Sequence, residues 1–184
     1  MAADLGWTAL RWPGMEHVIV SGEAGGITAA SHVVLAENRL VTVAYDLTCD
    51  VSFRFRKLTI SVTDPRGEQT LTLVSEDAGW RADGTSRPDL AGCADIDINC
   101  TPLTNTLPVR RLTWSGEATH DIDVAYVTVP ELEVRKASQR YTRLSPTLFR
   151  YESGSFRREL TLDESGFVLD YPGLWRRLSA AADR

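Results

Sequence analysis

The residues best suited to chemistry are two aspartates near the middle of the chain, Asp95 and Asp97. They occupy alternate positions of an expected strand, so both carboxylates point to one face, about 7 Å apart along the backbone. Such a pair can divide acid and base roles or bind a hard cation. In the alternative interpretation the aspartates cap loops or pair with arginine, since buried charges are almost always paired. No further oxygen ligand follows at metal-site spacing.

Three polar side chains, Asn105, Arg110 and Arg111, lie in the one segment that is expected to be helical. In one interpretation they line the mouth of a cavity or grip a polar head group. In the other, Asn105 caps a bend and the arginines pair with sheet carboxylates such as Asp95 and Asp97. The same residues serve either role, so both interpretations stay open.

Gln139 and Tyr141 share one face of an expected strand. Beside a sugar they could hydrogen-bond its hydroxyls, with the aromatic ring stacked on the ring face. The alternative is that they form cross-strand pairs on a half-solvated sheet.

The chain carries none of the common catalytic or cofactor motifs. Its three histidines, His17, His32 and His120, are far apart and have no second ligand type at zinc spacing. A nucleophile elbow, a phosphate-binding loop and a dinucleotide-binding turn are all missing. We therefore expect no metal and no cofactor, and a hydrolase or isomerase using Asp95 and Asp97 ranks behind binding functions.

Composition indicates one globular domain that does not bind nucleic acid. The 184 residues carry a net charge of −5, whereas binding to a phosphate backbone requires a clustered basic surface. The charge is uneven, because residues 131–184 hold 10 basic and 8 acidic side chains. No apolar run approaches the roughly 20 residues of a membrane span, and the first twenty residues lack a signal-peptide pattern. With three irregularly spaced cysteines, these features predict a cytoplasmic protein.

Alternation of apolar and polar residues predicts a sheet of long antiparallel strands. The clearest strand presents Val41, Val43, Tyr45, Leu47 and Cys49 on one face. The next strand, from Phe53 to Val62, changes phase at Arg56-Lys57, as a β-bulge would require. Further strands are expected at 15–21, 27–35, 71–73, 79–82, 93–99, 121–129, 132–144, 147–153, 156–163 and 166–170. We expect a single domain over 1–178 and a flexible tail over 179–184.

Residues 101–112 break the strand pattern and predict a short helix. Thr101 suits the N-cap and Pro102 the first helical position. Pro108 is expected to bend or end the first part of the helix, because an interior proline removes a hydrogen bond. A second turn or short helix is expected at 172–175, running towards the C-terminus.

Several segments resemble the putative glycolipid-binding family. They are Gly14-Met15-Glu16-His17, Tyr45-Asp46-Leu47-Thr48-Cys49-Asp50, Gly92-Cys93-Ala94-Asp95-Ile96-Asp97-Ile98, Thr101 to Arg111, Gln139-Arg140-Tyr141 and Leu169-Asp170-Tyr171-Pro172-Gly173-Leu174. The most specific is the run from Thr101 to Arg111, and the likeness covers nearly the whole chain.

The resemblance implies a mainly β fold, in which a long antiparallel sheet curls as a spiral β-roll around one central α-helix. It also implies a homodimer and brings no catalytic residue. We expect a lipid-like or glycolipid-like amphipathic ligand to be held between the curled sheet and the helix. The alternative function is a structural or interaction module without a small ligand.

Overall fold

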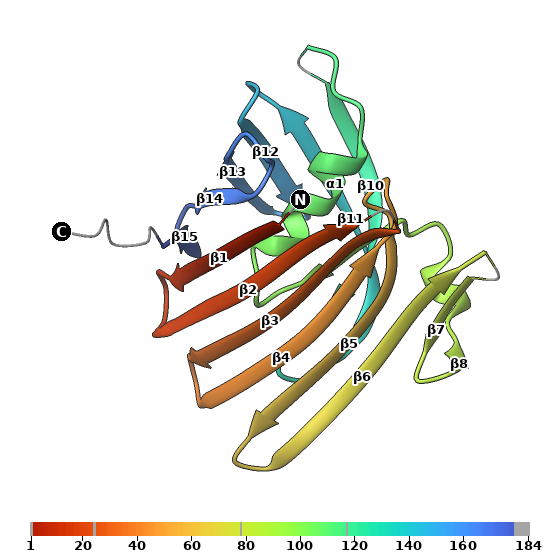
Figure 1. Ribbon diagram of the computed structural model, residues 1–184, viewed down its shortest axis with the longest axis vertical. Helices are drawn as coiled ribbons and strands as arrows, with labels where there is room; N and C mark the ends of the chain where they lie inside the picture. Colours follow the sequence, from red (N-terminus) through yellow and green to blue (C-terminus); the bar gives the residue numbers. More distant parts are fainter. Residues whose placement is uncertain (1, 24, 78, 117, 179–184) are drawn as a thin grey trace.

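The computed structural model describes residues 2–23, 25–77, 79–116 and 118–178 (Figure 1). The strands are β1 (Ala2–Ala9), β2 (Gly14–Glu23), β3 (Gly26–Ala36), β4 (Leu40–Cys49), β5 (Phe55–Asp64), β6 (Gly67–Glu76), β7 (Gly79–Ala82), β8 (Thr85–Ser86), β9 (Asp95–Ile98), β10 (Thr119–Val127), β11 (Val134–Arg143), β12 (Leu148–Ser153), β13 (Phe156–Leu162), β14 (Val168–Tyr171) and β15 (Trp175–Arg177). The helical segments are η1 (Pro88–Leu90), η2 (Leu103–Asn105) and α1 (Thr106–Arg111), of which η1 and η2 are 3-10 turns.

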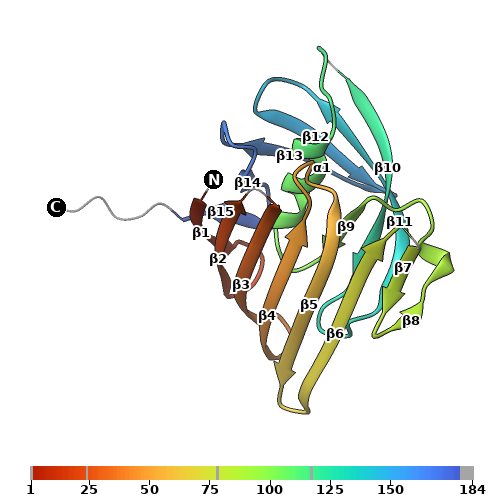
Figure 2. The ribbon, with the colours of Figure 1, turned by 45° about the vertical axis from the view of Figure 1, so that its right-hand side comes forward.

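All the strands belong to one curled sheet, so the predicted fold class is confirmed. The order is β8-β7-β6-β5-β4-β3-β2-β1-β15-β14-β13-β12-β11-β10-β9. Neighbouring strands are antiparallel except β9 and β10, which are parallel. The first and last strands therefore meet in the middle of the sheet, while the edge strands β8 and β9 follow one another in the chain. The sheet curls so that α1 lies inside it (Figure 2).

Strand alternation explains why one face of the sheet carries the core. In β4 the residues at every second position are buried, namely Val41, Val43, Tyr45, Leu47 and Cys49. This face packs towards η2 and α1, where residues 103–109 are buried as well. Burial of apolar surface at roughly 25 cal/mol per Å² is the main force that holds sheet and helix together.

The predicted β-bulge between β4 and β5 is confirmed. Thr48 lies opposite Lys57 and Cys49 lies opposite Phe55, which leaves Arg56 as the extra residue. Phe53, however, was wrongly expected in the strand. It has φ 62 and precedes β5, because the chain turns there before pairing resumes.

The predicted helix is present, but Pro108 does not end it. The Thr101 hydroxyl accepts a hydrogen bond of 3.0 Å from the Leu103 backbone N–H, close to the expected cap. The chain changes from a 3-10 turn to an α-helix at Thr106, so Pro108 falls in the first α-helical turn. Backbone N–H groups of that turn have no intrahelical partner, and proline therefore costs little there.

Strands β1 and β15 were not predicted, and they pair with each other. Trp7 lies opposite Arg177, and the Trp7 indole donates a hydrogen bond of 2.8 Å to the Val168 carbonyl. Of the turn or short helix expected at 172–175, the structure has the turn, with Gly173 at φ 76, and Trp175 already begins a strand. The expected tail, 179–184, lies outside the described residues. No helix in the described part of the chain is long and apolar enough to cross a membrane.

Candidate functional site

A cavity lies between η2 and the inner side of strands β9 to β15. Its volume is about 340 Å³. It is lined by Asp97, Ile98, Asn99, Thr101, Asn105, Tyr126, Arg135, Ala137, Tyr151, Ser153, Phe156, Tyr171, Leu174 and Trp175. We call this space the aromatic cavity.

Three rings from neighbouring strands form one wall of the aromatic cavity. The centre of the Tyr151 ring lies 6.0 Å from that of Phe156 and 6.3 Å from that of Tyr171. The Phe156 and Tyr171 ring centres are 6.3 Å apart. These positions follow from the hairpin register, since Ser153 pairs with Phe156 across the turn at Gly154. The rings support one another and present a stiff apolar surface.

A buried carboxylate, that of Asp97, lines the aromatic cavity. Its Oδ2 accepts hydrogen bonds from Gln139 Nε2 at 2.6 Å and from the Tyr151 hydroxyl at 3.4 Å, and its Oδ1 accepts one from Thr104 at 3.1 Å. Burial raises the pKa of Asp97 above its usual range, and these three hydrogen bonds oppose the rise.

Two tyrosine hydroxyls in the cavity wall are free to bind a ligand. Within the part of the chain that the structure describes, no group hydrogen-bonds to the hydroxyl of Tyr126 or Tyr171. Burial, followed by the nearby Asp97 charge, raises the pKa of both tyrosines. Both hydroxyls therefore stay protonated near neutral pH and can donate.

Asn105 adds an acceptor to the same cavity. Its Nδ2 donates a hydrogen bond of 2.8 Å to the Tyr141 hydroxyl. The amide oxygen makes no hydrogen bond to the described residues. Because Asn105 sits in η2 and faces the strands, its amide spans the gap between helix and sheet.

A second buried carboxylate, Glu16 on β2, was missed by the sequence analysis. Its Oε1 accepts hydrogen bonds from the hydroxyls of Ser31 (2.8 Å), Tyr45 (2.7 Å) and Thr101 (2.8 Å). Its Oε2 is buried and has no partner among the described residues. Burial raises the pKa of Glu16 to about 7, although the three hydroxyls oppose the rise. Thr101 lines the aromatic cavity, so Glu16 lies directly behind the cavity wall.

The structure places four of the predicted site residues at or directly behind the aromatic cavity. Asp97 and Asn105 line it, whereas Gln139 and Tyr141 are buried behind them and hold them in place. A ligand in the cavity would thus contact Asp97 and Asn105 directly. Gln139 and Tyr141 would affect it only by positioning those two side chains.

The other three predicted residues lie elsewhere. Arg111 and Asp95 form a bidentate ion pair, with Nε to Oδ1 at 2.9 Å and Nη2 to Oδ2 at 2.6 Å. This pair agrees with the alternative in which the helix arginines pair with sheet carboxylates. The Asp95 side chain is fully buried. The partners of Asp95 and Asp97 therefore differ, although the two residues are neighbours on β9.

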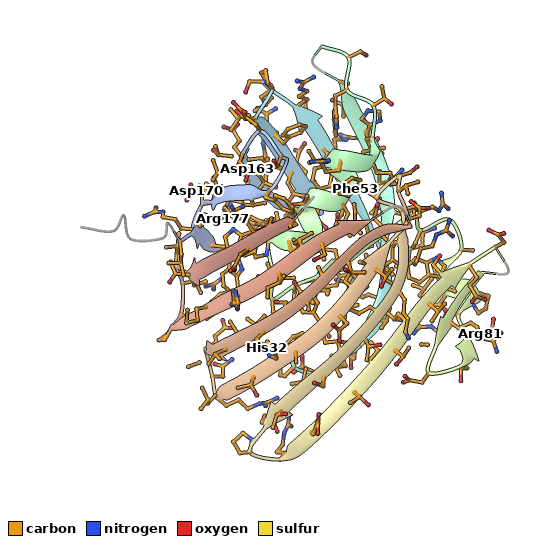
Figure 3. The ribbon with its side chains drawn as sticks, in the orientation of Figure 1. His32, Phe53, Arg81, Asp163, Asp170 and Arg177 are labelled. Carbon is orange, nitrogen blue, oxygen red and sulfur yellow. The ribbon has the colours of Figure 1, made fainter. Side chains whose placement is uncertain are left out.

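Arg110 belongs to a second, more open cavity of about 460 Å³ at the end of α1. Its guanidinium lies 4.5 Å from the centre of the Phe53 ring and donates to the Ser165 carbonyl. Figure 3 shows Phe53 close to α1. Trp114 and Arg143 line the same cavity.

The described residues offer neither a metal site nor a reactive thiol. No group of three or more His, Cys, Asp or Glu side chains within them is placed to hold a metal ion. Cys49, Cys93 and Cys100 are free and buried. Burial raises the pKa of Cys49 to about 12 and that of Cys93 to about 11, so neither is a thiolate at neutral pH.

Comparison with known proteins identifies the family. The sequence profile of a family described as putative glycolipid-binding matches residues 4–177. The chain belongs to this family. A crystal structure of a DUF1089 family protein from Pseudomonas aeruginosa is similar, with a TM-score of 0.81 and 34% identity over 89% of this chain and 92% of that one. A search of curated proteins found no match.

The predicted resemblance to the putative glycolipid-binding family is therefore confirmed. Family membership supports a binding role for the chain. The cytoplasmic location and the homodimer stay predictions, as do the individual roles of the site residues.

Proposed function

We propose that this chain binds a glycolipid-like amphipathic molecule and that the aromatic cavity, between curled sheet and helix, holds the hydroxyl-rich headgroup. The observation that carries the proposal is the combination of an aromatic wall, a buried carboxylate and free hydroxyls in one space. Asp97, Tyr126 and Tyr171 provide the polar groups.

The chemistry of the cavity matches that of a sugar ring. A sugar presents C–H groups on its faces and hydroxyls around its edge, so it needs flat apolar surface and several hydrogen-bond partners. The rings of Tyr151 and Phe156 offer the first. Around them, Tyr171 can donate and Asp97 and Asn105 can accept.

The size of the cavity favours a headgroup over a whole lipid. Ligand sites span roughly 300 to 1,000 Å³, and about 340 Å³ falls at the lower end. The cavity wall is also more polar than an acyl chain would require. We therefore place the headgroup of the ligand inside the aromatic cavity and its acyl chain towards the mouth of the cavity.

Tyr171→Phe is the variant that tests the proposed hydrogen bond to the ligand. We expect hexyl glucoside to bind the wild type and to bind Tyr171→Phe about 3- to 10-fold more weakly, the loss of one hydrogen bond. Isothermal titration calorimetry measures both affinities, and glucose and hexanol serve as the two halves of the ligand. Because Tyr171 donates to no described residue, the substitution leaves the fold intact.

Asp121→Asn is a suitable control because Asp121 is exposed on β10 and pairs with Arg140 at 2.7 Å. It should bind as the wild type does. No binding of hexyl glucoside to the wild type, or equal affinity for Tyr171→Phe, would contradict the proposal.

A further inference from the structure

Two exposed arginines are each stacked on a ring that lines the aromatic cavity, and we take their side of the cavity to be its mouth. The Arg135 guanidinium lies 4.8 Å from the centre of the Tyr126 ring, and Arg135 itself lines the cavity. The Arg158 guanidinium lies 4.7 Å from the centre of the Phe156 ring. Arg158 donates hydrogen bonds from Nε to the Pro172 carbonyl (3.2 Å) and from Nη1 to the Arg157 carbonyl (2.7 Å), and no described residue accepts one from its Nη2. Arg135 thus lies on the β10–β11 side of the aromatic cavity, and Arg158 lies on the β13–β14 side.

Neither arginine is neutralised by the described part of the protein. Neighbouring arginines on the same sheet do have acidic partners: Arg140 pairs with Asp121, Arg150 with Glu159 and Arg157 with Glu152. Arg135 and Arg158 form no ion pair with a described carboxylate, and both are exposed. Both positive charges are therefore available to a ligand, although the chain as a whole has a net charge of −5.

Stacking prepares these guanidiniums to bind an oxyanion. An aromatic face holds the guanidinium plane in position while its N–H groups point outwards from the edge. That fork of donors matches phosphate and carboxylate oxygens, and Arg is favoured wherever such groups are recognised. All guanidinium N–H groups of Arg135 are available to a ligand, because no described residue accepts a hydrogen bond from them.

We infer that the ligand carries an anionic, phosphate-like group between its headgroup and its acyl chain. Arg135 and Arg158 bind this group at the mouth of the aromatic cavity. The inference rests on the proposed function and deepens it. Asp97 is buried in the cavity wall whereas both arginines are exposed, and its carboxylate would repel an anion beside it. The hydroxyl-rich part of the ligand therefore faces Asp97, and the anionic group faces the two arginines.

One anionic and one neutral ligand together test the inference. Dihexanoyl phosphatidylinositol has a phosphate between a hydroxylated ring and its chains, whereas hexyl glucoside is neutral. We expect the wild type to bind the anionic probe at least about 10-fold more tightly at low salt. Arg135→Gln and Arg158→Gln should each weaken binding of the anionic probe about 5- to 10-fold and binding of hexyl glucoside less than 2-fold. Titration calorimetry gives these affinities.

Arg157→Gln is the matched control, since Arg157 is next to Arg158 but belongs to an ion pair with Glu152. It should leave the preference for the anionic probe unchanged. If hexyl glucoside binds and the anionic probe gains nothing, or if both arginine variants keep the preference, the inference is overturned while the proposed function stands. If neither probe binds, both fail.

Inorganic phosphate separates a lipid headgroup from a free anion. As a competitor it should displace the anionic probe only weakly, because it lacks the ring and the chains. Phosphate that binds as tightly as the lipid probe, and with the same dependence on Arg135 and Arg158, would overturn the glycolipid assignment of this site.

Discussion

Asp95→Asn is expected to lower the free energy of unfolding by about 3–5 kcal/mol, the usual cost of breaking one side of a buried ion pair. The Asp95 side chain has no exposed surface, and that of Arg111 is only 18% exposed. Without the carboxylate, the Arg111 charge stays at the junction of α1 and β9 with nothing to neutralise it. Urea denaturation followed by tryptophan fluorescence measures the loss.

The double variant Asp95→Leu/Arg111→Met separates charge burial from packing. It removes both charges together, so it should lose less stability than Asp95→Asn alone. Asp121→Asn again serves as the exposed control, and its stability should stay close to that of the wild type. A double variant that is as unstable as the sum of its singles would contradict this explanation.

The sequence predicts the fold well where one face of a strand is apolar and the other polar. Val41 to Cys49 have this pattern, and the structure buries the expected face. The bulge at Arg56 was also predictable, because a one-residue insertion shifts the period of the buried positions.

The pairing of β1 with β15 could not be predicted in the same way. It joins the two ends of the chain, and local alternation contains no information about which distant strand becomes the neighbour. Trp7 is fully buried by this pairing.

Glu16 was missed because both faces of its strand are apolar. Val18 and Val20 are buried on its side, while Met15 and Ile19 on the other side are each 51% exposed. Alternation alone therefore does not tell which face carries Glu16. Only the three hydroxyls that approach from β3, β4 and Thr101 explain how a carboxylate is accommodated inside.

The candidate site was predicted in part for a similar reason. Asp97 and Asn105 stand out because polar residues lie in otherwise buried segments. Tyr126, Tyr151 and Tyr171 look like ordinary strand aromatics, and only the sheet order brings them to one cavity.

Glu16→Gln is expected to change how stability depends on pH. The folded protein holds the Glu16 proton until a pKa of about 7, whereas the unfolded chain releases it near 4.5. Between these values the folded state binds more protons than the unfolded state, so stability falls as pH rises. The difference corresponds to about 3 kcal/mol for this one group, fully present below pH 4.5 and lost above pH 7.

The glutamine variant isolates that contribution. Its amide oxygen can still accept from Ser31, Tyr45 and Thr101, but it has no proton to lose. Denaturation at pH 5 and pH 8 should therefore show a decline in the wild type that Glu16→Gln lacks, and Glu68→Gln, at an exposed position of β6, should follow the wild type. Parallel pH profiles for wild type and Glu16→Gln would mean that the buried carboxyl ionises without penalty. In that case the unpartnered Oε2 would have to be solvated, contrary to its complete burial.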